Sequence, residues 1–171
     1  YNVWRGFTVS DPRPLNQEAN LALDYFLEHI LENVCGGDVD LASWFLGFFA
    51  HMIQHPERKP RVALALRGRK GVGKNVITEC IGRLLGTHYV LAANRRYLSG
   101  NFNSHLENKL LLVLDEAYWS GDKSTEGILK DLITGSTHQI ERKGHESYTV
   151  QNLLRVVIFG NEEWIVPASD D

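Results

Sequence analysis

The sequence lacks the features of secreted, membrane-spanning or metal-stapled proteins. It has only two cysteines, Cys35 and Cys80, which excludes a disulfide framework and favours a reducing compartment. No cysteine and histidine group has zinc-site spacing. No apolar run is long enough to cross a bilayer: residues 41–53 come closest, but Ser43 and His51 interrupt them, so a buried helix is predicted there. We therefore expect a cytoplasmic protein without a membrane partner.

The chain also lacks an excess of positive charge. Its 18 Lys and Arg against 21 Asp and Glu give a net charge of −3, so any contact with nucleic acid must be local. A length of 171 residues with 43% hydrophobic content suits one globular domain with its own core. Neither a methionine nor a signal-peptide pattern opens the chain, so we expect a piece of a larger protein.

What the sequence does contain is a glycine-rich loop between an apolar run at 62–66 and a helical pattern at 76–85. The apolar run is expected to be a buried parallel strand. The glycines allow sharp turns that bring backbone N–H groups to a polyphosphate, and the lysine adds charge for the terminal phosphates. The residues assigned to binding a nucleoside triphosphate are Gly68, Arg69, Lys70, Gly71, Val72, Gly73, Lys74 and Asn75. Asn75 stands where Ser or Thr usually holds magnesium, and its amide oxygen can still bind the ion directly or through water.

Polar residues follow two further apolar runs. Residues 110–114 end in Asp115 and Glu116, and residues 154–159 end at Gly160 and Asn161. Parallel strands deliver their last residues to the edge of the sheet where ligands bind. Asp115, with Asn75, is then the candidate magnesium ligand. The candidate catalytic residues are Lys74, Glu116, which would polarise the attacking water, and Asn161, which would orient that water or sense the γ-phosphate. An asparagine turn is the alternative for Asn161.

The N-terminal residues 1–57 are predicted to form a lead-in and a helical hairpin. One helix starts at a cap on Asn16 and ends near Gly36, with an apolar stripe that includes Leu23, Leu27 and Ile30. A second helix runs from about Asp38 to His55.

Residues 58–171 are predicted to form the core of the protein. Strands are expected at 62–66, 88–92, 110–114 and 154–159, helices at 76–85 and 124–133, and a β-hairpin at 139–151. Residues 94–108 are predicted to be irregular, with Phe102 as their anchor. Alternating strands and helices indicate an α/β sandwich with a mainly parallel sheet.

The bend of the predicted β-hairpin is cationic. Arg142, Lys143 and His145 flank Gly144 there and would project from the body. Such a tip suits contact with a phosphate backbone regardless of base sequence, although a solvated hairpin end is the alternative. Tyr148 is expected to pack across the strands rather than stack on a base.

In this order, these residues resemble the superfamily 3 helicases, which are AAA+ motors of small DNA viruses, phages and plasmids. The resemblance looks closest to phage and plasmid primase-helicases and their poxvirus relatives, and covers residues 60–165. It is carried by Gly68–Asn75, Asp115-Glu116, Leu129-Lys130…Thr134-Gly135…Lys143…His145 and Phe159-Gly160-Asn161.

The resemblance implies a P-loop NTPase sandwich that uses ATP and Mg²⁺. Lys74 would bind the β- and γ-phosphates, Asp115 magnesium, Glu116 would be the base and Asn161 the sensor. Lys143 and His145 would contact single-stranded or forked DNA in the channel of a hexamer, within the host cytoplasm if a phage encodes the protein.

The family also supplies an arginine from a neighbouring subunit shortly after the sensor asparagine, and residues 162–171 contain no arginine. We therefore expect this piece alone to hydrolyse ATP poorly or not at all. A further strand, outside the strand that precedes the glycine-rich loop, is expected beyond residue 171.

Three other functions stay open on the sequence. An initiator or loader ATPase would bind duplex DNA without unwinding it. A small-molecule kinase would use the same loop, although kinases usually add a lid with arginines. A nucleotide-binding scaffold would not turn the nucleotide over.

Overall fold

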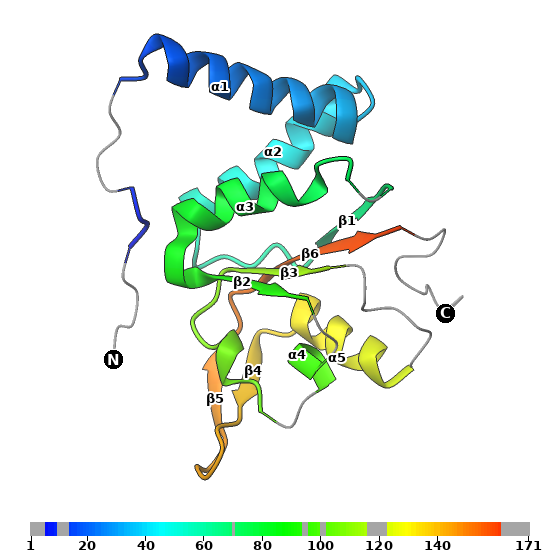
Figure 1. The fold of residues 1–171 in the computed structure, drawn as a ribbon. Helices are drawn as coiled ribbons and strands as arrows, with labels where there is room; N and C mark the ends of the chain where they lie inside the picture. The colour runs from blue at the N-terminus through cyan, green and yellow to red at the C-terminus, as the bar shows by residue number, and fades with distance from the viewer. Residues whose placement is uncertain are drawn as a thin grey trace.

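A parallel four-stranded sheet forms the centre of the protein (Figure 1). The computed structural model describes residues 6–9, 14–69, 71–93, 96–99, 102–115 and 123–161. In sheet order the strands are β1 (Ala63–Arg67), β6 (Arg155–Gly160), β3 (Leu111–Leu114) and β2 (Tyr89–Ala92). An antiparallel pair, β4 (Thr137–Ile140) and β5 (Tyr148–Gln151), lies apart from this sheet. The predicted mixed α/β fold with a mainly parallel sheet is confirmed, and each strand lies within a few residues of its predicted place.

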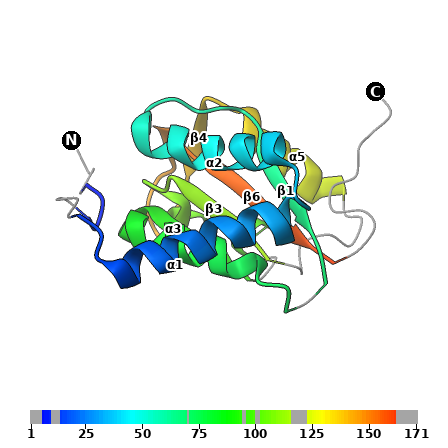
Figure 2. The ribbon, with the colours of Figure 1, turned by 90° about the horizontal axis from the view of Figure 1, so that it is seen from above.

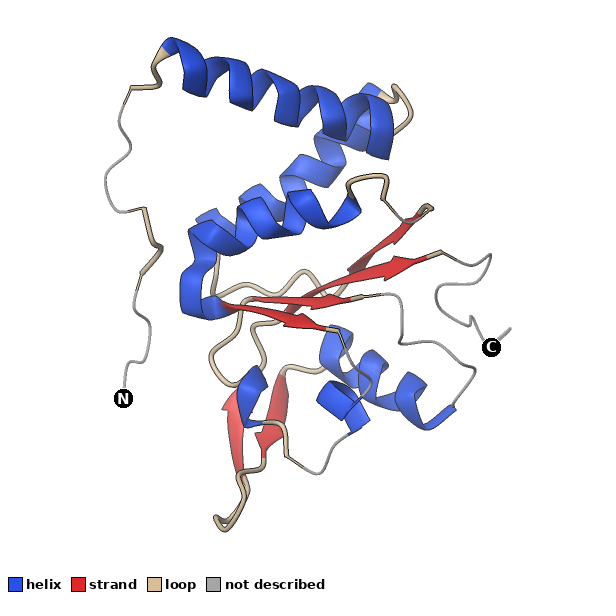
Figure 3. Ribbon diagram, in the orientation of Figure 1, coloured by secondary structure: helices blue, strands red, loops and turns tan. Residues whose placement is uncertain are grey.

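The two central strands are apolar on both faces because helices cover both faces (Figure 3). All four residues of β3 are buried, and alternate residues enter different cores. Leu111 and Val113 join the core under α2 (Val39–Gln54) and α3 (Lys74–Leu85). Leu112 and Leu114 join the core that packs against α5 (Lys123–Thr134).

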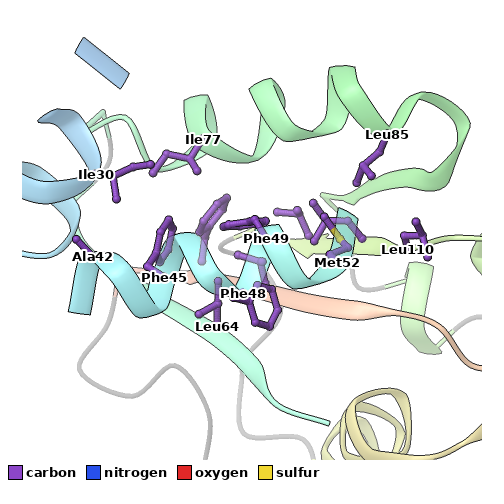
Figure 4. Packing of buried hydrophobic residues seen from close by; sticks show 14 of the residues in the cluster. Ile30, Ala42, Phe45, Phe48, Phe49, Met52, Leu64, Ile77, Leu85 and Leu110 are labelled. Carbon is purple, nitrogen blue, oxygen red and sulfur yellow. The ribbon is translucent and has the colours of Figure 1, made fainter. Parts of the chain in front are cut away.

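Helix α2 is built into the first core rather than standing beside it. Asp38 caps its N-terminus by accepting a hydrogen bond from the Leu41 amide at 2.9 Å. Its inward residues include Phe48 and Phe49, whose rings meet edge to face at 5.4 Å, in the same cluster as Leu64 (Figure 4). The predicted buried helix is confirmed. Among the described residues, no helix is both long and apolar enough to span a bilayer.

Helix α1 (Gln17–Glu28) departs from its predicted packing. Asn16 caps it as predicted, accepting from the Ala19 amide at 2.8 Å. However, α1 has no buried residue, and Leu23 and Leu27 are 42% and 38% exposed. Along α1 the predicted stripe is only partly confirmed: Phe26 packs against the first core, whereas Leu23 and Leu27 do not. The helix continues as a π-helix, η1 (His29–Val34), whose Ile30 is buried in the same core, so that a single 3.6-residue period does not describe the segment.

The second core also corrects an expectation. Phe102, predicted to anchor residues 94–108, is 50% exposed. This segment forms two short helices, α4 (Arg96–Ser99) and η3 (Ser104–Leu106), which place Leu98 and Leu106 in the core instead. Another short helix, η2 (Gly86–His88), joins α3 to β2. It includes His88, which was predicted to be the first residue of the strand.

A buried arginine ties the end of α2 to the start of β6. Arg155 is 0% exposed, and its guanidinium donates to the carbonyls of His55 and Pro56 at 2.8 Å each and of Leu153 at 2.9 Å. It also donates to the carbonyl of Arg58. Burial lowers the pKa of Arg155 to about 10. The backbone carbonyls thus provide acceptors for the two terminal nitrogens of a buried charged side chain, whereas its Nε has no hydrogen-bond partner among the described residues.

We expect Arg155→Met to lower the free energy of unfolding by about 3 kcal/mol, because it leaves several inward carbonyls without a donor. Urea denaturation measures this. The control is Arg58→Met: the Arg58 side chain is 71% exposed, so its loss should change stability by less than about 0.5 kcal/mol. Equal losses in the two variants would contradict the role given to Arg155.

Candidate functional site

Strand register brings the predicted site residues to one edge of the sheet. Arg67 at the end of β1 pairs with Gly160 at the end of β6, and the Gly68 amide donates to the Gly160 carbonyl at 3.1 Å. Asn161 therefore begins beside the glycine-rich loop. β3 pairs with the other side of β6, so Asp115 follows at the same carboxyl edge.

Lys74 lies at the centre of this edge. It is the first residue of α3 and only 9% exposed. Its Nζ donates to the Arg69 carbonyl at 3.0 Å and to Asn161 Oδ1 at 3.1 Å, and also to the Gly68 carbonyl. A buried ammonium needs such oxygen acceptors. Lys74 and Asn161, 87 positions apart, are thus in direct contact.

The loop has the backbone conformation that its glycines permit. Gly71 and Gly73 both have φ of 86°, a left-handed conformation that other residues adopt at a cost. Gly73 is the N-cap of α3, and no side chain of the described residues caps this helix end. The N-terminus of a helix is the positive end of its dipole and directs backbone N–H groups outward, which favours an anion.

A cavity of about 430 Å³ lies over this helix end. Its lining residues are Gly71, Val72, Gly73, Lys74, Asn75, Val76 and Asp115. Asp115 and Asn75, the two predicted magnesium ligands, thus line the same cavity. Within the described ranges no group of three or more His, Cys, Asp or Glu could hold a metal by itself. A magnesium ion here would share its coordination with phosphate oxygens and water, as this ion commonly does.

Three parts of the prediction lie outside the described residues. These are Glu116, the expected base, Lys70 in the loop, and residues 162–171, the segment that follows the predicted sensor asparagine. Of the remaining candidates, the structure brings Lys74, Asn75, Asp115 and Asn161 to one edge, together with the described glycines of the loop.

A second cavity, of about 390 Å³, was not predicted from the sequence. It follows the outer side of β1 from Trp44 and Phe45 of α2 to Gly68 and Lys74. No strand within the described ranges pairs with this side of β1. Trp44 and Leu41 of α2 line it and are 53% and 47% exposed, and no sequence pattern distinguishes them from the buried apolar residues of the same helix.

The three cationic residues at the hairpin tip differ in their contacts. Lys143 and His145 are exposed in the loop between β4 and β5. Arg142 instead forms an ion pair with Glu107 and lies over the Tyr148 ring at 5.6 Å. Tyr148 faces Ile140 across the strands, and its hydroxyl donates to Glu107 Oε1 at 2.7 Å. Burial raises the pKa of the Glu107 carboxyl, but the hydrogen bonds from Arg142 and Tyr148 outweigh this and lower it overall.

Asn103 binds the β4 side of the same hairpin. Its Nδ2 donates to the Gln139 carbonyl at 2.7 Å, and its Oδ1 accepts from the Glu141 amide at 2.8 Å. Asn103 and Glu107 are site residues that sequence reasoning missed. Both act on residues more than thirty positions away, which no local pattern reveals.

His29 is a further residue that sequence reasoning missed. It lies at the start of η1, and its Nε2 is 3.3 Å from the carbonyl oxygen of Gly73 in the glycine-rich loop. The N-terminal helical segment therefore contacts the candidate site directly.

Comparison with known proteins identifies a phage relative of the chain and solved structures with a similar fold. The chain is 27% identical over 147 residues to the DNA primase-polymerase of Nitratiruptor phage NrS-1. The match covers 84% of this chain and 20% of the relative, so the chain spans about a fifth of that protein.

Solved structures of the NrS-1 C-terminal region are similar to it in fold. One apo structure superimposes with a TM-score of 0.75 at 24% identity, covering 86% of this chain and 36% of the other. Another, an A-form apo structure, gives 0.73 at 26% identity, covering 85% and 35%. A family model matches residues 66–171, and the chain therefore belongs to the family described as DUF5906, a family of unknown function.

Proposed function

We propose that this chain is the ATP-hydrolysing motor region of a phage-type DNA replication protein. The observation that carries the proposal is the contact of Lys74 Nζ with Asn161 Oδ1 at 3.1 Å, beside a cavity that Asp115 lines. A lysine, an amide and a carboxylate that meet at a helix N-terminus are the groups that a triphosphate with magnesium requires. The resemblance to superfamily 3 helicases supports a motor of the P-loop AAA+ type. The similarity to the NrS-1 primase-polymerase supports a role in DNA replication.

In this proposal the oxygens around Lys74 stand in for phosphate oxygens. The carbonyls of Gly68 and Arg69 satisfy the ammonium until a β- or γ-phosphate oxygen replaces them. The N-terminus of α3, with its positive dipole end, would bind the same phosphates. Because the loop already has its left-handed glycines in place, little reordering opposes binding.

Asp115 and Asn75 would hold magnesium, which neutralises charge on the transferring phosphoryl group when bound. Asn161, already in contact with Lys74, would orient the attacking water and report the γ-phosphate. Glu116 would polarise that water. The trans arginine of the family would come from another subunit of a hexameric ring.

DNA is the proposed partner of the hairpin. Lys143 and His145 are exposed, and the segment is attached to the body through Asn103 and Glu107. A cationic tip on a hairpin that is attached to the rest of the protein suits contact with a phosphate backbone in a channel. Single-stranded or forked DNA would be held there, within the host cytoplasm.

Three other functions would use the same site. An initiator or loader ATPase would also bind ATP but would not displace a strand. A small-molecule kinase would transfer phosphate to a metabolite, and a scaffold would bind ATP without turnover. ATP hydrolysis that single-stranded DNA stimulates, together with strand displacement by the full-length protein, favours the helicase over all three.

Binding of ATP by the chain is the first test. We expect a fluorescent ATP analogue with Mg²⁺ to bind, and Lys74→Ala to weaken binding at least tenfold, a loss of about 1.4 kcal/mol or more. Fluorescence anisotropy measures this. Arg83→Ala is the control, because Arg83 is exposed at the far end of the same helix. Equal binding by the Lys74→Ala variant would rule out the nucleotide site.

Hydrolysis is the second test. A longer protein that includes residues beyond 171 should hydrolyse ATP faster with single-stranded DNA, and Glu116→Gln should reduce turnover by about 10²-fold or more with little change in ATP binding. A phosphate-release assay measures this. We expect the 171-residue chain to turn over slowly in the same assay. An unchanged rate in Glu116→Gln would favour a scaffold.

The hairpin gives the third test. Lys143→Gln should weaken binding of single-stranded DNA by about threefold to tenfold and reduce its salt dependence, because one phosphate contact is lost. Lys143→Arg keeps the charge and should bind as the wild type does. Fluorescence anisotropy with a labelled oligonucleotide at several salt concentrations measures both. If Lys143→Gln and Lys143→Arg bind equally, the tip does not contact the DNA backbone.

A further inference from the structure

The N-terminal helical segment supports the glycine-rich loop through one side chain. His29 Nε2 lies 3.3 Å from the Gly73 carbonyl oxygen, across 44 positions of sequence. A carbonyl oxygen only accepts hydrogen bonds, so Nε2 must carry the proton. The same carbonyl accepts from the Val76 amide at 3.2 Å, in the first turn of α3. His29 therefore binds the loop at the residue where it becomes a helix.

The imidazole also fills the space beside Gly73. A Cβ at Gly73 would lie 2.8 Å from His29 Cε1 and 2.9 Å from Nε2, closer than real Cβ contacts. Gly71 has the same φ of 86° but nothing within 4 Å of a Cβ. The two glycines thus differ mainly in whether the imidazole of His29 packs against them.

The position of His29 is fixed by the core. It begins the π-helix η1, in which the Cys35 amide donates to the Ile30 carbonyl five residues back at 2.9 Å. Ile30 is 1% exposed and lies close to Ile77 of α3 (Figure 4). The π-turn therefore sets its first residue against the loop, and such turns often occur at functional sites.

We propose that His29 is a positioning residue that preforms the phosphate-binding loop. By donating to Gly73 and packing against it, His29 holds this glycine left-handed and the start of α3 in place. A glycine without this support adopts positive and negative φ about equally, and a ligand must then order it on binding. This inference rests on the proposed nucleotide site and extends it to a segment outside the family match, which begins at residue 66.

The first experiment separates the hydrogen bond from simple packing. His29→Phe keeps a ring without a donor, and His29→Gln keeps an N–H that reaches a similar distance. Hydrogen exchange of the ligand-free chain, read on peptides covering residues 71–77, should be faster in His29→Phe and near wild type in His29→Gln. Binding of the fluorescent ATP analogue should weaken about fivefold in His29→Phe and less than twofold in His29→Gln.

The two readouts keep this inference distinct from the proposed function. If the wild type does not bind the analogue but exchange follows the expected pattern, the nucleotide function fails and the role of His29 in the loop stands. If exchange in His29→Phe equals that of the wild type, or if His29→Gln behaves as His29→Phe does, the positioning role is overturned.

A second pair of variants tests the contact even if His29→Phe folds poorly. Gly73→Ala should lower the urea midpoint more than Gly71→Ala, since only the Gly73 Cβ meets the imidazole. In a His29→Ala background this difference should disappear, because the two glycines have the same φ of 86°. A difference that persists without the imidazole would overturn the contact.

Discussion

The parallel pairing of β1 with β6 is the constraint on which the candidate site depends. It sets Arg67 beside Gly160, so that the glycine-rich loop and Asn161 leave the sheet side by side. The pairing holds because β6 is buried along almost its whole length and lies between β1 and β3. A slip of one residue would turn every β6 side chain to the opposite core, and the two cores therefore fix the position of Asn161.

Burial of Lys74 follows from this register and explains its oxygen partners. An ammonium group at 9% exposure is unfavourable unless acceptors surround it, and Asn161 Oδ1 is one of those acceptors. The loop carbonyls of Gly68 and Arg69 also accept from it, so oxygen atoms of two chain-distant segments stabilise the buried charge.

Sequence reasoning succeeded where a short local pattern was sufficient. The runs that became β3 and β6 are apolar at nearly every position, and Asn16 and Asp38 lie directly before the helices that they cap. Because parallel strands end at one edge, the meeting of Lys74, Asp115 and Asn161 could also be predicted, whereas what these residues do remains a proposal.

Sequence reasoning failed where tertiary contacts overrode a pattern. Phe102 is the bulkiest apolar residue in its segment, yet the short helices around it turn Leu98 and Leu106 inward. The contact of His29 with Gly73 depends on a π-turn, and no sequence period encodes that turn.

The attachment of the hairpin links its position to the acidic strand. Asn103 and Glu107 both lie in the segment that leads into β3, and Asp115 follows β3 directly. β3 is buried and paired on both sides, so it resists displacement. A hairpin that moved on DNA would therefore have to break its contacts with Asn103 and Glu107 or carry the η3 segment with it. The Arg142 side chain is half exposed, so water and salt weaken its ion pair with Glu107.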